Sequence, residues 1–260
     1  SVNILQKVIK WNSHLLFSYS DYKVTKNLNP PSVTGIASSG TSLFPLENYH
    51  PYLLVSYRWA GLNPLNGNPR GYLNNEISED YYQMQSNSIE DQVIHGPAIS
   101  PYFGALRNNI GWQKWILTVG INYKFGHYFR KPTLNYTSLF QYGDSNGNQE
   151  YENRWSKEGD EKYTDVPSQI FPSDSRRDNF YAYSEINVQK ADYIRLNEIR
   201  LQYQWIPQNT KSLKSIVCYT YIDNMNVFVW NANKWKIDPE NIKGYRRPVT
   251  YSVGIQLNLQ

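Results

Sequence analysis

The chain has 260 residues, enough to bury a sizeable core, and its 26 Lys and Arg against 22 Asp and Glu give a net charge of +4, too small and dispersed to indicate nucleic-acid binding. No apolar run approaches the roughly 18 residues of a membrane helix, which excludes a helical membrane protein. The single cysteine, Cys218, excludes an internal disulfide framework and is expected to be a small buried residue.

Alternation of apolar and polar residues predicts β-strands along the chain and no convincing helix. The predicted strands span 9–19, 52–60, 100–110, 115–125, 192–205, 215–230 and 249–259, with 52–60 and 100–110 the weaker candidates. Within 215–230, Val217, Tyr219 and Tyr221 share one face. The last strand places on one face Val249, Tyr251, Val253, Ile255, Leu257 and Leu259. The expected fold class is all-β, with about seven antiparallel strands.

The connections between these strands differ in length in an ordered way. Gly111-Trp112 and residues 206–214 are short, whereas residues 130–191 form a long segment rich in Asn, Asp, Ser and Tyr. Loops beyond about 15 residues are uncommon in compact domains unless they have a function. Short turns at one end of the strands and long loops at the other are the layout of outer-membrane barrels, with the turns periplasmic and the loops extracellular.

Strand length and charge placement favour a transmembrane β-barrel over a soluble β-sandwich. Sandwich strands usually have about 5 or 6 residues, whereas about 10 tilted residues, as found here, span roughly the 25 Å height of a barrel's apolar band. Arg or Lys on the lipid side costs about 2–4 kcal/mol, and the apolar sets of 115–125, 199–205 and 249–259 contain neither. Rings cluster near strand ends, as at Tyr203 and Trp205, where a membrane interface favours them.

The number of predicted strands bears on whether these residues could form a complete barrel. Lipid cannot satisfy an unpaired strand edge, and about seven strands leave two edges open. The chain begins without methionine, and we expect it to be a piece of a longer protein. Two alternatives remain open at this point: a soluble β-sandwich module that binds glycans, and a small outer-membrane barrel that closes on itself.

Five longer motifs follow one another along the chain. They are YRWAGLNPLNGNPRGYLN (57–74), GPAISPYFGALRNNIGWQKWILTVGINYKFGHYFRKP (96–132), RWSKEGDEKYTDVPS (154–168), KADYIRLNEIRLQYQWIP (190–207) and RRPVTYSVGIQLNL (246–259). In this order they resemble the C-terminal part of the SusC/RagA-type TonB-linked outer-membrane proteins. The chain departs from that family at Glu158, where proline is usual, and at Leu259-Gln260, where the closing aromatic residue is usual.

The resemblance implies a fold, a location and a role. It implies that residues 1–260 are the C-terminal part of the barrel of a TonB-dependent receptor, about seven strands out of about 22, in the outer membrane and surrounded by its lipid. It further implies import of oligosaccharides or peptides together with a SusD-like surface lipoprotein. The TonB complex would act through an N-terminal part that, like the plug domain, is not among these residues.

The sequence offers no arrangement of catalytic residues. His14, His50, His95 and His127 lack metal-ligand spacing, and KEGDEK (157–162) is interpreted as solvated loop charge rather than an acid–base pair. We therefore expect no enzyme activity, no metal site and no cofactor.

Aromatic side chains in or beside the long loops are the candidate contacts for substrate or partner. The candidates are Trp155, Tyr163, Trp230 and Trp235, whose flat rings suit a sugar or peptide face, with loop packing or interface anchoring as the alternative role of each. If Gln260 ends on the periplasmic side, counting strands back places 130–191 and 231–245 at the cell surface.

Overall fold

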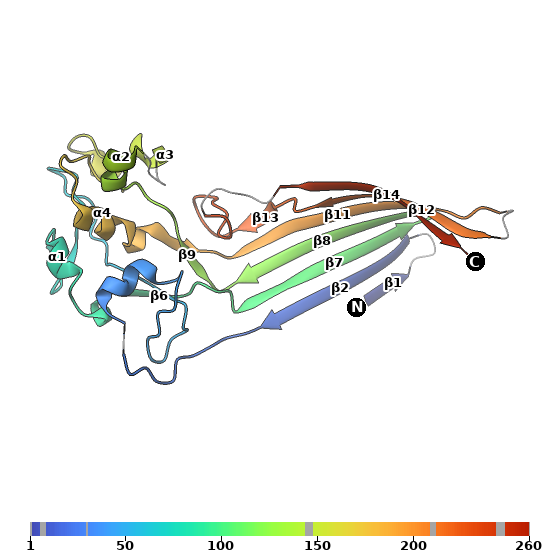
Figure 1. Ribbon diagram of the computed structural model, residues 1–260, viewed down its shortest axis with the longest axis horizontal. Helices are drawn as coiled ribbons and strands as arrows, with labels where there is room; N and C mark the ends of the chain where they lie inside the picture. The colour runs from blue at the N-terminus through green and yellow to red at the C-terminus, as the bar shows by residue number, and fades with distance from the viewer. Residues whose placement is uncertain are drawn as a thin grey trace.

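The computed structural model describes residues 2–5, 9–29, 31–143, 148–208, 212–242 and 248–259. It has two parts, a long sheet and a cap that gathers at one end of the strands (Figure 1). The cap comprises the described residues of 20–101 and 126–192, which connect strands of the sheet. The chain end at Gln260 and the Arg246-Arg247 pair of the last motif lie outside the described residues.

The sheet has eight strands, ordered β1-β2-β7-β8-β11-β12-β14, with β13 paired to β11, and every pair is antiparallel. The strands are β1 (Val2–Leu5), β2 (Ile9–Tyr19), β7 (Tyr102–Trp112), β8 (Trp115–Phe125), β11 (Tyr193–Trp205), β12 (Leu213–Asp223), β13 (Val227–Asn231) and β14 (Thr250–Leu259). These strands confirm the antiparallel all-β expectation. The predicted strand 215–230 is two strands, because Asn224 and Asn226 between them have left-handed φ angles of 55° and 51°.

The connections confirm the expected division into short and long. Gln113 and Lys114 link β7 to β8, and residues 206–212 link β11 to β12, of which 209–211 lie outside the described residues. The turn expected at Gly111-Trp112 is displaced by two residues, because Trp112 still pairs with Trp115 and Gln113 takes the left-handed φ of 51°. Figure 1 shows the long connections together at the opposite end.

The cap contains short elements that residue periodicity does not predict. Its strand pairs are β3 (Leu53–Ser56) with β6 (Val93–Pro97), β4 (Gly71–Leu73) with β5 (Glu76–Ser78), and β9 (Tyr128–Arg130) with β10 (Val188–Lys190). Its α-helices are α1 (Tyr81–Met84), α2 (Tyr136–Tyr142), α3 (Asn148–Tyr151) and α4 (Ser175–Ala182), and its 3-10 helices are η1 (Val33–Ser38), η2 (Ile89–Asp91), η3 (Asp160–Lys162) and η4 (Glu185–Asn187).

Two sequence expectations are therefore corrected. The segment 52–60 does not add a strand to the large sheet: only Leu53–Ser56 is strand, and it is buried within the cap. Helices do occur. A capping side chain precedes each of α1, α2 and α4 and accepts a hydrogen bond from a backbone N–H of the first turn; the capping residues are Asp80, Asn135 and Asp174. They have at most eight residues, too few for a helical apolar period to show.

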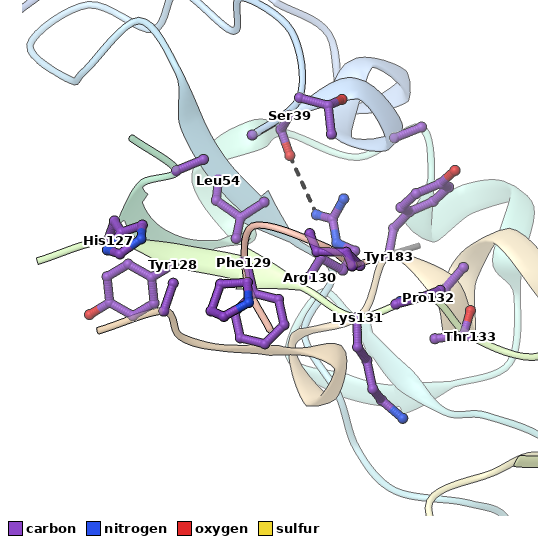
Figure 2. A pocket seen from close by; sticks show the side chains of 18 of the residues that line it. Ser39, Leu54, His127, Tyr128, Phe129, Arg130, Lys131, Pro132, Thr133 and Tyr183 are labelled. Carbon is purple, nitrogen blue, oxygen red and sulfur yellow. Dashed lines mark hydrogen bonds between the residues drawn. The ribbon is translucent and has the colours of Figure 1, made fainter. Parts of the chain in front are cut away.

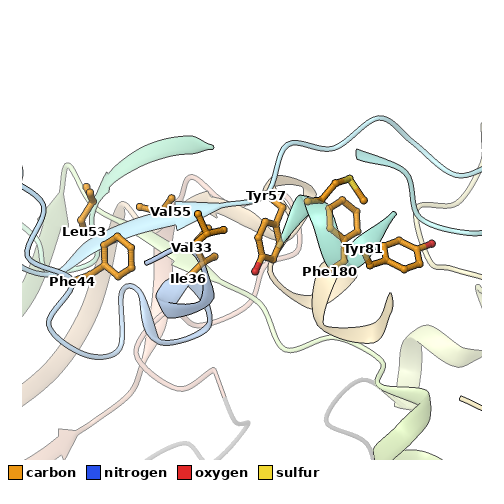
Figure 3. Packing of buried hydrophobic residues seen from close by; sticks show 9 residues of the cluster. Val33, Ile36, Phe44, Leu53, Val55, Tyr57, Tyr81 and Phe180 are labelled. Carbon is orange, nitrogen blue, oxygen red and sulfur yellow. The ribbon is translucent and has the colours of Figure 1, made fainter. Parts of the chain in front are cut away.

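The hydrophobic core lies in the cap. Its main cluster joins η1, β3, α1 and α4 through Val33, Ile36, Phe44, Leu53, Val55, Tyr57, Tyr81, Met84 and Phe180 (Figure 3). A smaller cluster joins Leu134, Tyr136 and Val166. Phe180 is stacked on Tyr57 with ring centroids 5.4 Å apart, so α4 is held against the β3 segment.

The sheet extends from this core as a single layer (Figure 1). Over the described part of the chain, no second layer covers its apolar side chains, and Val253 and Leu15 remain 83% and 68% exposed. A β-sandwich requires such a layer, so the sandwich interpretation is not supported. Among the described strands, β1 and β14 lie at opposite edges of the sheet.

Within the same residues, no helix is both long and apolar enough to pass through a lipid bilayer.

Candidate functional site

Strand register gathers uncharged side chains on one side of the sheet, here called the apolar face. Its members include Trp11, Leu15, Phe17 and Tyr19 on β2, Leu106, Ile110 and Trp112 on β7, Trp115, Leu117, Val119, Ile121 and Tyr123 on β8, Ile199, Leu201, Tyr203 and Trp205 on β11, Ile216 and Ile222 on β12, and Tyr251, Val253, Ile255 and Leu257 on β14. Cys218 also lies on this face, opposite Ile255, and it is exposed, not buried as expected. Its strand, β12, lies between β11 and the edge strand β14 in a sheet of a single layer, which leaves the thiol uncovered.

Aromatic rings form a band at each end of the apolar face. At the cap end, Tyr19 and Tyr102 have ring centroids 5.0 Å apart, and Tyr123 and Phe125 are 5.6 Å apart. At the turn end, Trp115 and Tyr203 are 4.8 Å apart. A strand rises about 3.3 Å per residue, so Trp115 and Tyr123 are about 26 Å apart along β8. At a strand tilt of about 40° this corresponds to roughly 20 Å along the barrel axis, which fits within the roughly 25 Å apolar band of a membrane barrel.

The opposite side of the sheet, the polar face, carries paired charges. Arg107 on β7 forms an ion pair with Glu198 on β11, with 2.6 Å between Nη2 and Oε1. The hydroxyl of Tyr221 donates to the other oxygen of Glu198 at 2.8 Å. The carboxylate lies against Gly120, where a Cβ would approach Oε1 to 2.7 Å. Charge and hydrogen bonds on this side are suited to water rather than to hydrocarbon.

The tyrosines of β12 also lie on the polar face. Tyr221 pairs with Ser252, and Tyr219 pairs with Gly254, so the face shared by Val217, Tyr219 and Tyr221 is the polar one. The ring of Tyr219 covers Gly254, and the Arg200 guanidinium lies 4.5 Å from its centroid.

A pocket of about 970 Å³ lies where the cap meets the end of the sheet. Its wall is formed by η1, β3, β9, the end of β8, the ends of α2 and α4, and residues 239–242. The lining includes the cations Lys124, Arg130 and Lys131. The rings of Tyr128 and Phe129 lie beside Arg130 and Lys131 (Figure 2). A concave site of this size with apolar walls and a few polar groups is the usual form of a small-molecule site.

Arg130 is held in this pocket by uncharged acceptors. Its Nη2 donates to the carbonyl oxygen of Val55 at 2.5 Å and to Oγ of Ser39 at 3.4 Å, and its Nη1 donates to the carbonyl of Ile36 at 3.4 Å. The guanidinium also lies 5.0 Å from the ring centroid of Tyr183. Burial lowers the pKa of Arg130 to about 10, which keeps the side chain charged at neutral pH.

His127 occupies the other end of the lining (Figure 2). It is 7% exposed, and its Nδ1 lies 3.7 Å from Oδ1 of Asp192. Burial lowers the pKa of His127 to about 4, against an opposing effect of Asp192, so the imidazole is neutral at pH 7. Nδ1 has no hydrogen-bond partner among the described residues.

The four aromatic residues expected to contact substrate or partner do not converge. The Trp155 ring packs on Gly67, where a Cβ would approach Cδ2 of the ring to 2.5 Å, and its Nε1 donates to Glu161 at 3.3 Å. Tyr163 is 90% exposed at the end of η3. Trp155 therefore has a packing role, whereas Tyr163 is free to meet another molecule.

The other two candidates lie nearer the sheet. Trp230 on β13 joins the ring band, 6.2 Å from Phe125 between centroids. Trp235 stacks edge-on with Phe129 at 6.0 Å, and Nζ of Lys131 lies 5.1 Å from its ring centroid. Because Phe129 and Lys131 line the pocket, Trp235 supports the pocket wall from behind.

The pocket could not be read from the sequence. It joins residues near 37–41, 54, 98–100, 124–142, 182–191 and 239–242, and no single motif contains them all. Histidine spacing in the sequence bears on metal binding and does not indicate that His127 lines a pocket. In the described part of the chain, no group of three or more His, Cys, Asp or Glu side chains could hold a metal ion.

No protein-family model and no curated protein matches the chain. Solved structures of the RagAB peptide transporter have the same fold, with TM-score 0.66 and 19% identity, over 98% of this chain and 28% of that one. The RagAB peptide importer matches in its closed-closed state with TM-score 0.63, 19% identity and coverage of 98% and 28%, and in its open-open state with 0.62, 18%, 98% and 27%. At these identities the likeness concerns the fold. The chain is therefore similar in fold to a segment that makes up little more than a quarter of those transporter chains.

Proposed function

We propose that residues 1–260 are the C-terminal barrel part of a TonB-dependent outer-membrane transporter that imports oligosaccharides or peptides. Transport, and not catalysis, is proposed because the fold neighbours are an importer and a transporter of peptides. The motif resemblance to SusC/RagA-type proteins supports the same role.

The observation that carries the proposal is the uncovered apolar face. Soluble monomers rarely expose contiguous apolar patches larger than a few hundred Å². Here, exposed side chains from β2 to β14 form one such surface, bounded by two ring bands. Lipid chains would cover this surface, and aromatic rings prefer the two membrane–water interfaces. The open edges at β1 and β14 would pair with the remaining strands of a barrel of about 22.

The polar face then lines the lumen, and the cap lies outside the cell. Paired charges such as Arg107 with Glu198 would face water inside the barrel. In this arrangement the exposed Tyr163, and Trp235 beside the pocket, are the best-placed contacts for the solute or for a SusD-like lipoprotein, while Trp155 and Trp230 assist through packing. TonB would act on the part of the protein that precedes these strands.

Uptake by intact cells tests this function. Cells that make the complete protein and cells that lack it are given fluorescent tripeptides or oligosaccharides, with and without a protonophore. The proposal predicts accumulation that requires both the protein and the proton-motive force. Accumulation that is independent of either one would contradict import.

A further inference from the structure

We propose that the pocket at the junction of cap and sheet binds a solute through its carboxylate group, with Arg130 as the anion-binding residue. This assignment deepens the proposed function by naming the chemical class of the ligand, and it rests on that function only for the idea that the ligand is an imported solute.

Arg130 is a pocket cation without a counter-ion. The acceptors of its hydrogen bonds are two backbone carbonyls and a serine hydroxyl, and Nε is buried without a hydrogen-bond partner among the residues that the structure describes. Among the described residues, no carboxylate forms an ion pair with it. Taking an unpaired charge out of water is costly, and proteins usually place an opposite charge beside it. A ligand carboxylate would supply that charge.

The other cations of the pocket are already neutralised. Lys124 forms an ion pair with Glu240, and Lys131 forms one with Glu150. Of these three lining cations, Arg130 is therefore left with a full positive charge in the described structure. One uncompensated charge matches a monoanion such as a carboxylate better than a phosphate group, which carries nearly two negative charges at pH 7.

The rest of the pocket wall suits an organic acid whose carboxylate is attached to a larger group with apolar surface. Tyr128 and Phe129 follow one another on β9, and Leu54 and Ile99 add apolar surface. His127, three residues before Arg130, also lines the pocket and is neutral at pH 7, so it adds no competing charge. The volume of about 970 Å³ accommodates a tripeptide or a disaccharide.

Matched probes test the assignment on the complete protein that contains these residues, purified in detergent micelles. Calorimetric titration compares acetyl-Ala-Glu-Ala-amide with acetyl-Ala-Gln-Ala-amide, which differ only in the side-chain charge, and glucuronate with glucose. Tighter binding of the peptide acid identifies a peptide carboxylate, and tighter binding of glucuronate identifies a sugar acid. Either result supports the site, and equal affinities within both pairs overturn it.

Variants locate the binding to the pocket. Arg130→Met should weaken binding of the acidic probe by about tenfold or more, since a hydrogen bond to a charged group is lost. Arg176→Met is the control, because Arg176 is exposed on α4 and outside the pocket lining. An acidic probe that binds the Arg130 and Arg176 variants equally well contradicts the assignment.

A second pair avoids the risk that Arg130→Met disturbs the cap. Ala37 is exposed and lines the pocket, so Ala37→Asp adds a negative charge at the rim, and Ala37→Asn is its neutral counterpart. The Asp variant should bind the acidic probe several-fold more weakly than the Asn variant, with the neutral probe unaffected. Equal affinity of both variants overturns the site. If the protein imports solute but binds none of the probes, the carboxylate site is wrong and the transport role stands. If the probes bind but no import occurs, the transport role is wrong and the site stands.

Discussion

The phenol of Tyr123 on β8 crosses Gly104 on β7 and donates a hydrogen bond of 2.7 Å to the carbonyl oxygen of Leu16 on β2. A side chain at 104 has no room, because its Cβ would collide with that carbonyl oxygen and with the phenol. The missing side chain thus allows one ring to tie three strands together within the ring band at the cap end.

This contact predicts that a single methyl group added at position 104 strongly destabilises the protein. Gly104→Ala should lower the free energy of unfolding by about 2–3 kcal/mol, because the obstacle is partly backbone and must shift. The control is Gly111→Ala on the same strand, where the nearest atom to a new Cβ is 3.6 Å away. Urea unfolding of the protein in detergent micelles measures both, and equal losses would exclude the steric explanation.

A buried ion pair fastens residues 231–242 to the sheet. Arg195 and Asp238 are each 4% exposed, with 2.6 Å between Nη2 and Oδ1. Asp238→Ala should cost about 3 kcal/mol, since it leaves the buried Arg195 with only its longer, 3.6 Å contact to Glu240. Adding Arg195→Met should recover much of the loss. Lys124→Met is the control: its ion pair with Glu240 is about two-fifths exposed and should contribute less than about 1 kcal/mol. A double variant no more stable than Asp238→Ala would contradict this explanation.

Cap stability should depend on pH through His127. Its pKa is about 4 in the fold against an ordinary 6.5, and Asp192, Lys124 and Glu240 are the charged groups that face it. The unfolded state therefore binds more protons between these values, and cap stability falls by up to about 3 kcal/mol as pH drops from 6.5 to 4. Hydrogen exchange of cap amides measures this, and His127→Gln should flatten the dependence. An unchanged profile in the variant would assign the effect to other groups.

Variants of Trp155 and Tyr163 should distinguish a residue that stabilises the cap by packing from one that contacts the solute or the lipoprotein. Trp155→Ala removes a ring packed on Gly67 and should cost the cap about 3 kcal/mol. Tyr163→Ala removes a side chain that is 90% exposed and should change stability by less than about 0.5 kcal/mol, while reducing uptake or lipoprotein binding. Thermal unfolding and uptake are measured on the same preparations. Full uptake by the Tyr163 variant would remove it as a contact.

Much of the sheet could be predicted from sequence because long strands repeat a simple period. β8 and β14 occupy nearly the segments whose alternation is cleanest, 115–125 and 249–259. Alternation did not show which face of β12 is apolar, since Tyr219 and Tyr221 suit either one and the register with β14 decides. Nor did it show that the apolar phase of β11 shifts at the bulge between Leu196 and Glu198.

The cap and its pocket are a different case. Their helices and strands are too short to show a period, and their contacts join residues far apart in sequence, as with Arg130 and Val55. That Arg130 lacks a counter-ion is visible only once the fold places it. The prediction that Cys218 is buried is wrong for a related reason: a strand residue is buried only where another layer covers its face, and no described part of the chain covers this one.

Cys218 offers the most direct test that lipid touches the apolar face. It is the chain's only cysteine, it is exposed, and it lies opposite Ile255 near the middle of β14. A nitroxide is attached to the unfolded protein, which is then folded into lipid vesicles, and collision rates with oxygen and with a water-soluble nickel chelate are compared. The control carries Cys218→Ser and Ser252→Cys, which moves the label to the polar face. The account predicts that oxygen reaches the label at Cys218 and the chelate does not, with the reverse at position 252; free access of the chelate to Cys218 would contradict it.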